Sequence, residues 1–166
     1  TANIYIQKIE LEPIEYDNKI IGTTRSFNHE TLATPYATIT KDELIRGENN
    51  TKHVMWYGPY TLTPPGFYEV EYNIRVYPKG DNYSDNIITL DVLSSKTLTK
   101  ITEYNHTAAD AQVGVWETIT LQFNLFEPQI LEFRGMYPSN SWIIELSEIT
   151  INPMLTQQAI LPLSVD

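Results

Sequence analysis

The stretch "GFYEVEYNIRV", residues 66–76, carries the clearest structural signal in the sequence. Every second side chain from Tyr68 to Val76 is apolar or aromatic, and charged or amide side chains stand between them. This period of two is typical of a β-strand that buries one face and exposes the other. We expect the apolar face to lie in a hydrophobic core that includes Tyr68, Val70, Tyr72, Ile74 and Val76.

The same alternation returns in three later segments. They read "NIITLDVLS" (residues 86–94), "WETITLQFNL" (116–125) and "ILEFRG" (130–135). Short strands separated by turns, without alternating helices, favour antiparallel sheets. The buried face of the second segment is expected to include Ile119, Leu121 and Phe123.

A shift in the alternation marks the last apolar segment, "SWIIELSEITI", residues 141–151. Its apolar residues change parity between Leu146 and Ile149. One extra residue in a strand reverses the facing of everything after it. We therefore expect a β-bulge near Ser147.

Helical periodicity is weak throughout the sequence. The segment "TKDELIRG", residues 40–47, is the one plausible short helix. We therefore predict an all-β fold in which two antiparallel sheets pack face to face as a β-sandwich. Residues 1–153 are expected to form this single domain, and residues 154–166 a C-terminal tail or linker.

The composition argues against several classes of partner. With 11 basic and 21 acidic residues, the chain has a formal net charge of -10, which opposes binding to nucleic acid and to anionic membranes. No apolar run approaches the roughly 18 to 20 residues that cross a bilayer. Cysteine is absent, which excludes disulfides and cysteine zinc sites. We expect neither a nucleic-acid partner nor insertion into a membrane.

No constellation of residues indicates catalysis. The histidines His29, His53 and His106 are far apart and lack the spacing of a zinc site, and no serine lies in a G-x-S-x-G motif. Glu69 and Glu71 are the obvious candidates for the two carboxylates of a glycoside hydrolase. Their positions on an expected strand favour a solvated strand face instead. We therefore expect no catalytic residues.

The order of the segments resembles that of a known family. A "GPY…L.PG.Y.V.Y" strand is followed by "I.LDV", "W….L.F", "LEFR" and "I.EL..I.I". This succession, over residues 54–151, resembles the jelly-roll β-sandwich carbohydrate-binding modules attached to enzymes that act on polysaccharides. The resemblance implies a non-catalytic module that binds carbohydrate, a possible fusion to a catalytic domain, and a secreted or cell-surface location.

The loop "MYPSNSW", residues 136–142, is the sharpest candidate for a sugar-binding platform. Sugars are held by aromatic rings and by polar side chains that hydrogen-bond to hydroxyls. Tyr137 and Trp142 stand on either side of a polar turn, and we expect them to form the platform with Asn140 and Arg134. In the alternative interpretation, Trp142 begins the last strand and covers the core.

A second candidate platform is formed by Trp56 and Tyr57. The two residues are adjacent, so in an extended segment only one of them faces inward. The other is then available to stack on a ligand.

The resemblance also implies a structural calcium ion that joins the first and last strands. Calcium prefers several oxygen ligands, and carboxylates supply the charge. Glu10 and Glu12 in the first strand and Glu145 in the last strand are the expected ligands. The alternative is that these acids lie unbound on a solvated edge.

Two other functions fit the same sequence. A structural, assembly or adhesin-type β-sandwich would use the aromatic residues for contacts with proteins. A carboxylate-based enzyme that acts on glycans would be compatible with the same fold. The favoured interpretation is the non-catalytic carbohydrate-binding module.

Overall fold

The computed structural model describes residues 23–48, 53–80, 84–137 and 141–154 of the chain. In these ranges the chain forms strands joined by turns, and none of these residues belongs to a helix long and apolar enough to cross a membrane. The strands are β1 (Arg25–Phe27), β2 (Thr38–Ile39), β3 (Ile45–Gly47), β4 (His53–Trp56), β5 (Pro59–Thr63), β6 (Gly66–Pro78), β7 (Asn86–Ser94), β8 (Thr99–Thr107), β9 (Trp116–Leu125), β10 (Gln129–Tyr137) and β11 (Trp142–Met154).

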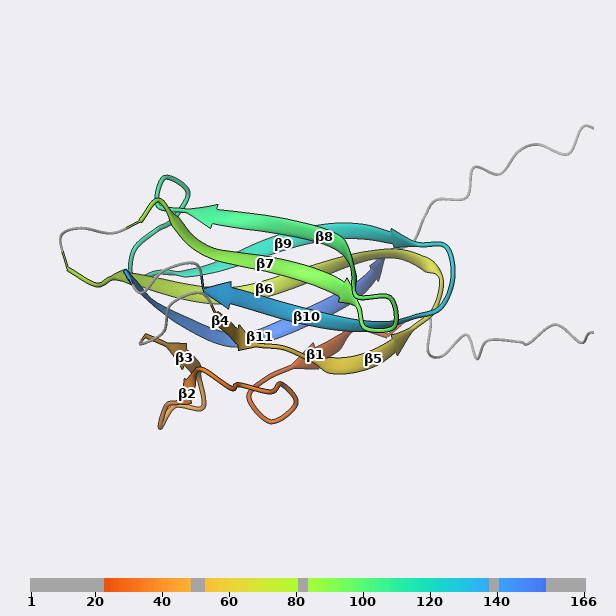
Figure 1. Cartoon of the computed structure of the whole chain (residues 1–166), viewed down its shortest axis with the longest axis horizontal. Coiled ribbons are helices and arrows are strands. Elements are labelled where there is room, and N and C mark those ends of the chain that lie inside the picture. The colour runs from red at the N-terminus through yellow and green to blue at the C-terminus, as the bar shows by residue number, and fades with distance from the viewer. Residues whose placement is uncertain (1–22, 49–52, 81–83, 138–140, 155–166) are drawn as a thin grey trace, which may run out of the picture.

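The strands form two antiparallel sheets that lie as two layers (Figure 1). The six-stranded sheet has the order β2-β3-β11-β6-β9, and β1 also pairs with β11. The five-stranded sheet has the order β4-β10-β7-β8, and β5 also pairs with β10. The predicted all-β fold, a two-sheet β-sandwich of the jelly-roll kind, is therefore confirmed.

The hydrophobic core lies between the two sheets. Strand β6 runs between β11 and β9, and its residues alternate between buried and partly exposed positions. From the five-stranded sheet, Leu90, Val92, Leu131 and Phe133 are fully buried. The residues that the sequence predicted for the core are all buried, namely Tyr68, Val70, Tyr72, Ile74, Val76, Ile119, Leu121 and Phe123.

A bulge in β11 allows both halves of this strand to face the core. The register between β6 and β11 shifts between Leu146 and Glu148, which leaves Ser147 as the additional residue. Asn73 on β6 holds the bulge, because its amide donates a hydrogen bond of 2.8 Å to the Ser147 hydroxyl. Leu146 and Ile149 are consequently both buried, as the shift in parity predicted.

The prediction of a short helix at residues 40–47 is wrong. This segment forms a turn followed by β3, which pairs with β2 as a hairpin. The Thr40 amide donates to the Leu44 carbonyl at 2.9 Å, and Glu43 has a left-handed backbone with a φ of 63°. Ile45 is fully buried on a strand that pairs with β11, so tertiary packing outweighs the local helical preference.

The predicted domain limits extend beyond the described part of the chain. Strand β11 ends at Met154, next to the predicted boundary between residues 153 and 154. Residues 1–22 and 155–166 lie outside the described residues. The division into a domain at 1–153 and a tail at 154–166 therefore stays a prediction.

Candidate functional site

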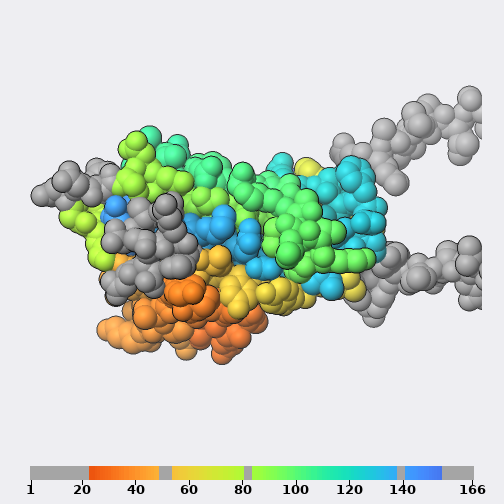
Figure 2. Space-filling view, in the orientation of Figure 1, coloured from red at the N-terminus to blue at the C-terminus, as the bar shows by residue number. Residues whose placement is uncertain are grey.

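The outer face of the five-stranded sheet brings several polar side chains together. Figure 2 looks onto this face, with β10 in blue between the green strands β7 and β8 and the yellow strands β4 and β5. Because Leu131 and Phe133 of β10 are buried in the core, the alternating residues Glu132 and Arg134 face outward. Asp91 lies opposite Arg134 on β7 and faces the same way.

An ion pair between Asp91 and Arg134 forms the centre of this face. Arg134 donates from Nε to Oδ1 at 2.8 Å and from Nη2 to Oδ2 at 2.6 Å, which is a bidentate geometry. The Asp91 side chain is fully buried, and 20% of the Arg134 side chain is exposed. The hydrogen bonds to Asp91 raise the pKa of Arg134. Both oxygens of Asp91 are thus already occupied.

Glu132 lies near this ion pair without sharing its contacts. Only 8% of the residue is exposed, and within the described ranges its carboxylate accepts no hydrogen bond and forms no ion pair. Burial raises the pKa of this carboxyl group, the charge of Arg134 lowers it, and the charge of Asp91 raises it. Its oxygens are not among the fully buried polar atoms that lack a partner, so solvent still reaches them. The carboxylate therefore has accepting capacity that the described residues leave unused.

Two tyrosines from the segment around the start of β5 flank these charges. The rings of Tyr57 and Tyr60 meet edge to face with centroids 6.2 Å apart. Tyr60 is 52% exposed, and its φ of 62° is a left-handed conformation that is rare for an aromatic residue. Partial burial and the charge of Glu132 raise the pKa of the Tyr60 hydroxyl, and Arg134 lowers it. The Tyr60 ring is therefore within electrostatic reach of both charged side chains.

The β8 side of the face is polar and exposed. The Thr89 hydroxyl of β7 donates to the Asn105 side chain of β8 at 2.6 Å. Lys100 and Glu103 of β8 form an ion pair with each other. This margin offers amide and hydroxyl groups, and its charges compensate one another.

The β5 side of the face is apolar. Leu62 of β5 and Ile130 of β10 are paired across the two strands and are 63% and 42% exposed. They continue the exposed surface of Tyr60 along β5. The covered charges in the middle of the face are thus bordered by aromatic and aliphatic surface on this side.

Three of the aromatic residues predicted to bind sugar lie in the core instead. Tyr137 is 2% exposed, Trp142 is 1% exposed and Trp56 is 0% exposed. The Trp142 indole donates to the Ser84 carbonyl at 2.9 Å, and its backbone amide donates to the Tyr137 hydroxyl at 3.2 Å. Strands β10 and β11 carry Tyr137 and Trp142 into the sandwich, so neither ring presents a face to a ligand. The predicted platform is therefore wrong, and the alternative in which Trp142 begins the last strand and covers the core is confirmed.

Arg134 and Tyr57 are the predicted site residues that the structure brings to one face. The parity argument is confirmed, because Trp56 is fully buried and the adjacent Tyr57 is partly exposed. Asn140, which was predicted to assist the platform, lies outside the described residues.

Three residues of this face were not predicted, namely Tyr60, Asp91 and Glu132. The alternation in "LDV" and "LEFR" was the available signal, because it places Asp91 and Glu132 opposite the apolar side chains of their strands. The sequence does not show that β7 and β10 are neighbours. Even the paired residues of these strands that are nearest in sequence, Ser94 and Leu131, are 37 residues apart.

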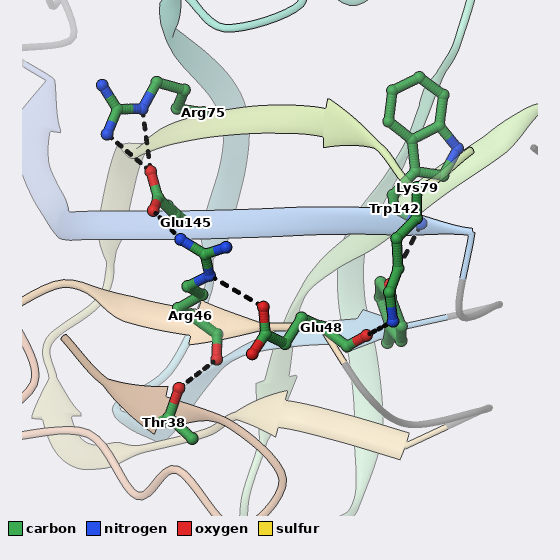
Figure 3. A network of polar contacts seen from close by, with 8 residues as sticks. Thr38, Arg46, Glu48, Arg75, Lys79, Trp142 and Glu145 are labelled. Carbon is green, nitrogen blue, oxygen red and sulfur yellow. Dashed lines mark hydrogen bonds and ion pairs between the residues drawn. The ribbon is translucent and has the colours of Figure 1, made fainter. Parts of the chain in front are cut away.

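Glu145 does not fit the predicted calcium site (Figure 3). Its Oε1 accepts a hydrogen bond from Arg46 at 3.2 Å, and its Oε2 accepts one from Arg75 at 2.7 Å. Calcium requires oxygen ligands whose charge is available to it, and two guanidinium groups already occupy this carboxylate. Glu10 and Glu12, the other predicted ligands, lie outside the described residues.

Glu69 and Glu71, the candidate hydrolase carboxylates, lie on the other sheet. They occupy outward positions on β6, opposite the buried residues of that strand. Gln122 donates to Glu69 at 3.0 Å, and Asn152 donates to Glu71 at 3.3 Å. Both acids therefore belong to a hydrogen-bonded polar face, which agrees with their interpretation as a solvated strand face.

A hollow of about 360 Å³ lies where the β7–β8 and β9–β10 connections meet. Its polar lining is partly used, because Ser94 donates to Gln129 at 2.7 Å and Gln129 donates to Glu127 at 2.9 Å. Phe126 at its border is 89% exposed. This hollow offers one aromatic ring and lacks the buried charges of the outer face.

Comparison with solved structures places the fold among carbohydrate-binding modules. A xylan-binding module, CBM15, superposes with a TM-score of 0.54 at 8% sequence identity, and the match covers 80% of this chain and 97% of the CBM15 chain. The CBM27-1 module of Caldicellulosiruptor saccharolyticus, in complex with mannohexaose, gives a TM-score of 0.53 at 14% identity, over 81% of this chain and 99% of its own.

The C-terminal CBM6 module of LamC, a marine laminarinase from Zobellia galactanivorans, gives a TM-score of 0.52 at 15% identity, over 78% of this chain and 99% of its own. No protein-family model and no curated protein matches the sequence. The chain thus has the jelly-roll fold of carbohydrate-binding modules, and identities of this size establish the fold alone.

Proposed function

We propose that this chain is a non-catalytic carbohydrate-binding module and that its ligand lies on the outer face of the five-stranded sheet. The observation that carries the proposal is the position of Tyr57 and Tyr60 beside Glu132 and the Asp91–Arg134 pair. Exposed rings next to buried polar groups are the combination that a sugar requires.

The chemistry of a pyranose matches this arrangement. Its C–H face packs on an aromatic ring, and the exposed Tyr60 ring offers such a surface. Its hydroxyls donate to carboxylates and accept from guanidinium groups, which Glu132 and the exposed edge of Arg134 supply. Because binding also costs entropy, such a site gives micromolar to millimolar affinity, about 4 to 8 kcal/mol.

The proposal is tested by titrating the protein with soluble polysaccharides in affinity electrophoresis and calorimetry. The panel contains xylan, mannan, laminarin and mixed-linkage β-glucan. We expect Tyr60→Ala to weaken binding by about tenfold, because stacking contributes on the order of 1 kcal/mol. Substitution of Phe126, an exposed aromatic away from the face, is the matched control.

Two results would contradict the placement or the function. Loss of binding in Phe126→Ala with full binding in Tyr60→Ala would move the ligand to the hollow between the β7–β8 and β9–β10 connections. If no glycan of a broad panel retards the migration of the parent protein, the proposed carbohydrate-binding function is wrong.

One observation favours a second candidate function, an assembly module that contacts proteins. Tyr60, Leu62 and Ile130 form a continuous exposed apolar margin on β5 and β10. Light scattering separates the two functions. A stable oligomer that is dissociated by Leu62→Lys, together with no glycan binding, would support the assembly module.

A further inference from the structure

Two carboxylates of the outer face have ion-pair partners and a third has none among the described residues. This difference affects which glycans the face can bind. Strands β7, β8 and β10 carry the carboxylates Asp91, Glu103 and Glu132 and the basic side chains Arg134 and Lys100. Asp91 is paired with Arg134, and Glu103 is paired with Lys100. Glu132 is the carboxylate left over on these strands.

The guanidinium that the described residues place at the centre of the face is already compensated. Arg134 holds Asp91 with its Nε and Nη2 groups, and only 20% of its side chain is exposed. An anionic ligand group would therefore meet a neutralised ion pair. It would also approach Glu132, which forms no hydrogen bond and no ion pair among the described residues.

We infer that Glu132 makes this face selective for uncharged glycans over glycans that carry uronate or sulfate groups. The inference rests on the proposed carbohydrate-binding function and names the ligand class of that same face. Glu132 accepts hydroxyl donors from a neutral sugar in place of the solvent that reaches its carboxylate oxygens. A ligand carboxylate at this place brings a like charge into a partly desolvated site, which is unfavourable.

The groups that act on the Glu132 carboxylate come from three strands of this sheet. They are Tyr60 on β5, Asp91 on β7, and Arg134 on its own strand β10. Burial and Asp91 raise the pKa of its carboxyl group, and Arg134 lowers it. In its ionised form the carboxylate accepts hydrogen bonds and repels anions.

The test compares neutral and acidic oligosaccharides of equal length by calorimetry. The neutral probes are mannohexaose, xylohexaose and cellohexaose, and the acidic probes are the hexamers of mannuronate and galacturonate. We expect the parent protein to bind at least one neutral hexamer, and to bind acidic hexamers at least about tenfold more weakly. In Glu132→Gln, which keeps size and polarity, this ratio should fall to about threefold or less.

A matched variant and a salt series separate the local effect from the net charge of -10. Glu69→Gln removes one charge from the opposite sheet, where the Glu69 carboxylate accepts a hydrogen bond from the neutral Gln122 side chain, so its neutral-to-acidic ratio should stay at the parental value. Repulsion by the whole molecule is screened strongly at about 1 M salt, whereas a short contact with a covered carboxylate is screened much less. The ratio of the parent should therefore persist at about 1 M salt.

The outcomes are distinct. If the parent binds acidic hexamers as well as neutral ones, or if its preference disappears at high salt, the selectivity of Glu132 is overturned and the carbohydrate-binding function stands. An unchanged ratio in a folded Glu132→Gln variant also overturns it. If the parent binds neither class, the proposed function fails and the selectivity fails with it.

Discussion

The Asp91 carboxylate and the Arg134 guanidinium hold each other across β7 and β10 through two hydrogen bonds of 2.8 and 2.6 Å. Asp91 has no exposed surface, so loss of Arg134 leaves a buried charge without compensation. We expect Arg134→Ala to lower the free energy of unfolding by about 3 kcal/mol. Urea unfolding monitored by tryptophan fluorescence measures this loss.

The matched control for this prediction is Arg46→Ala. The Arg46 side chain is 34% exposed, and its partner Glu145 keeps a second arginine. We expect a loss of about 1 kcal/mol or less for this control. Equal losses in the two variants would contradict the special role of the Asp91–Arg134 pair.

Glu132→Gln should change the pH dependence of stability. Because burial raises the pKa of Glu132, the folded chain binds this proton more readily than the unfolded chain does. The parent therefore loses stability as the pH rises above the ordinary carboxyl value of about 4.3. Glutamine carries no such charge, so the variant should be at least as stable as the parent at about pH 7 and lose this advantage below about pH 4. Melting temperatures across this range test the prediction, and an advantage that grows toward low pH would contradict it.

Alanine at Gly135 should destabilise the protein more than alanine at Gly47. A Cβ atom at Gly135 would lie 2.2 Å from the Trp56 ring, a rigid group in the core. A Cβ atom at Gly47 would meet the end of the Met55 side chain at the same distance, and methionine adapts its rotamers readily. We expect a loss of about 2 to 3 kcal/mol for Gly135→Ala and about half of that for Gly47→Ala, measured by urea unfolding. The reverse order would show that the tryptophan can move.

Glu145→Gln should destabilise the protein equally with and without calcium. Glu145 accepts hydrogen bonds from both Arg46 and Arg75, and the variant loses its charge in both contacts. We expect a loss of about 1.5 to 3 kcal/mol in calcium and in chelator. If calcium stabilises the parent by mass action and this shift disappears in the variant, Glu145 is a calcium ligand after all.

The sequence predicted which side chains of each strand face the core, because burial of one face makes every second residue of a strand apolar. The alternation from Tyr68 to Val76 placed β6 correctly, and the parity shift located the bulge at Ser147. Both signals are local in sequence. They need no knowledge of which strand lies beside which.

The candidate site could be predicted only in part, because it depends on strand neighbours and strand ends. For Trp142 the sequence left two interpretations open, a loop residue or the first residue of the last strand, and Tyr137 was interpreted as a loop residue. In the structure β10 ends at Tyr137 and β11 begins at Trp142, which carries both rings into the core. Glu145 was correctly placed on the last strand, yet its partners Arg46 and Arg75 are 99 and 70 residues away in sequence. Such pairings follow from the folded topology and leave no local pattern.

The bulge at Ser147 also constrains how this sequence can change over generations. Strand β11 meets β3 at residues 144–146 and β1 at residues 149–151, with the additional residue between the two contacts. Leu146, Glu148 and Ile149 already pair with the consecutive residues Ile74, Asn73 and Tyr72 of β6. Loss of Ser147 alone would therefore leave Glu148 outward and Ile149 inward, and would remove only the bulge and its hydrogen bond to Asn73. Deletion of one residue elsewhere in β11 would instead reverse the facing of the residues beyond it. In descendants of this sequence, a one-residue alignment gap inside β11 is therefore expected at Ser147.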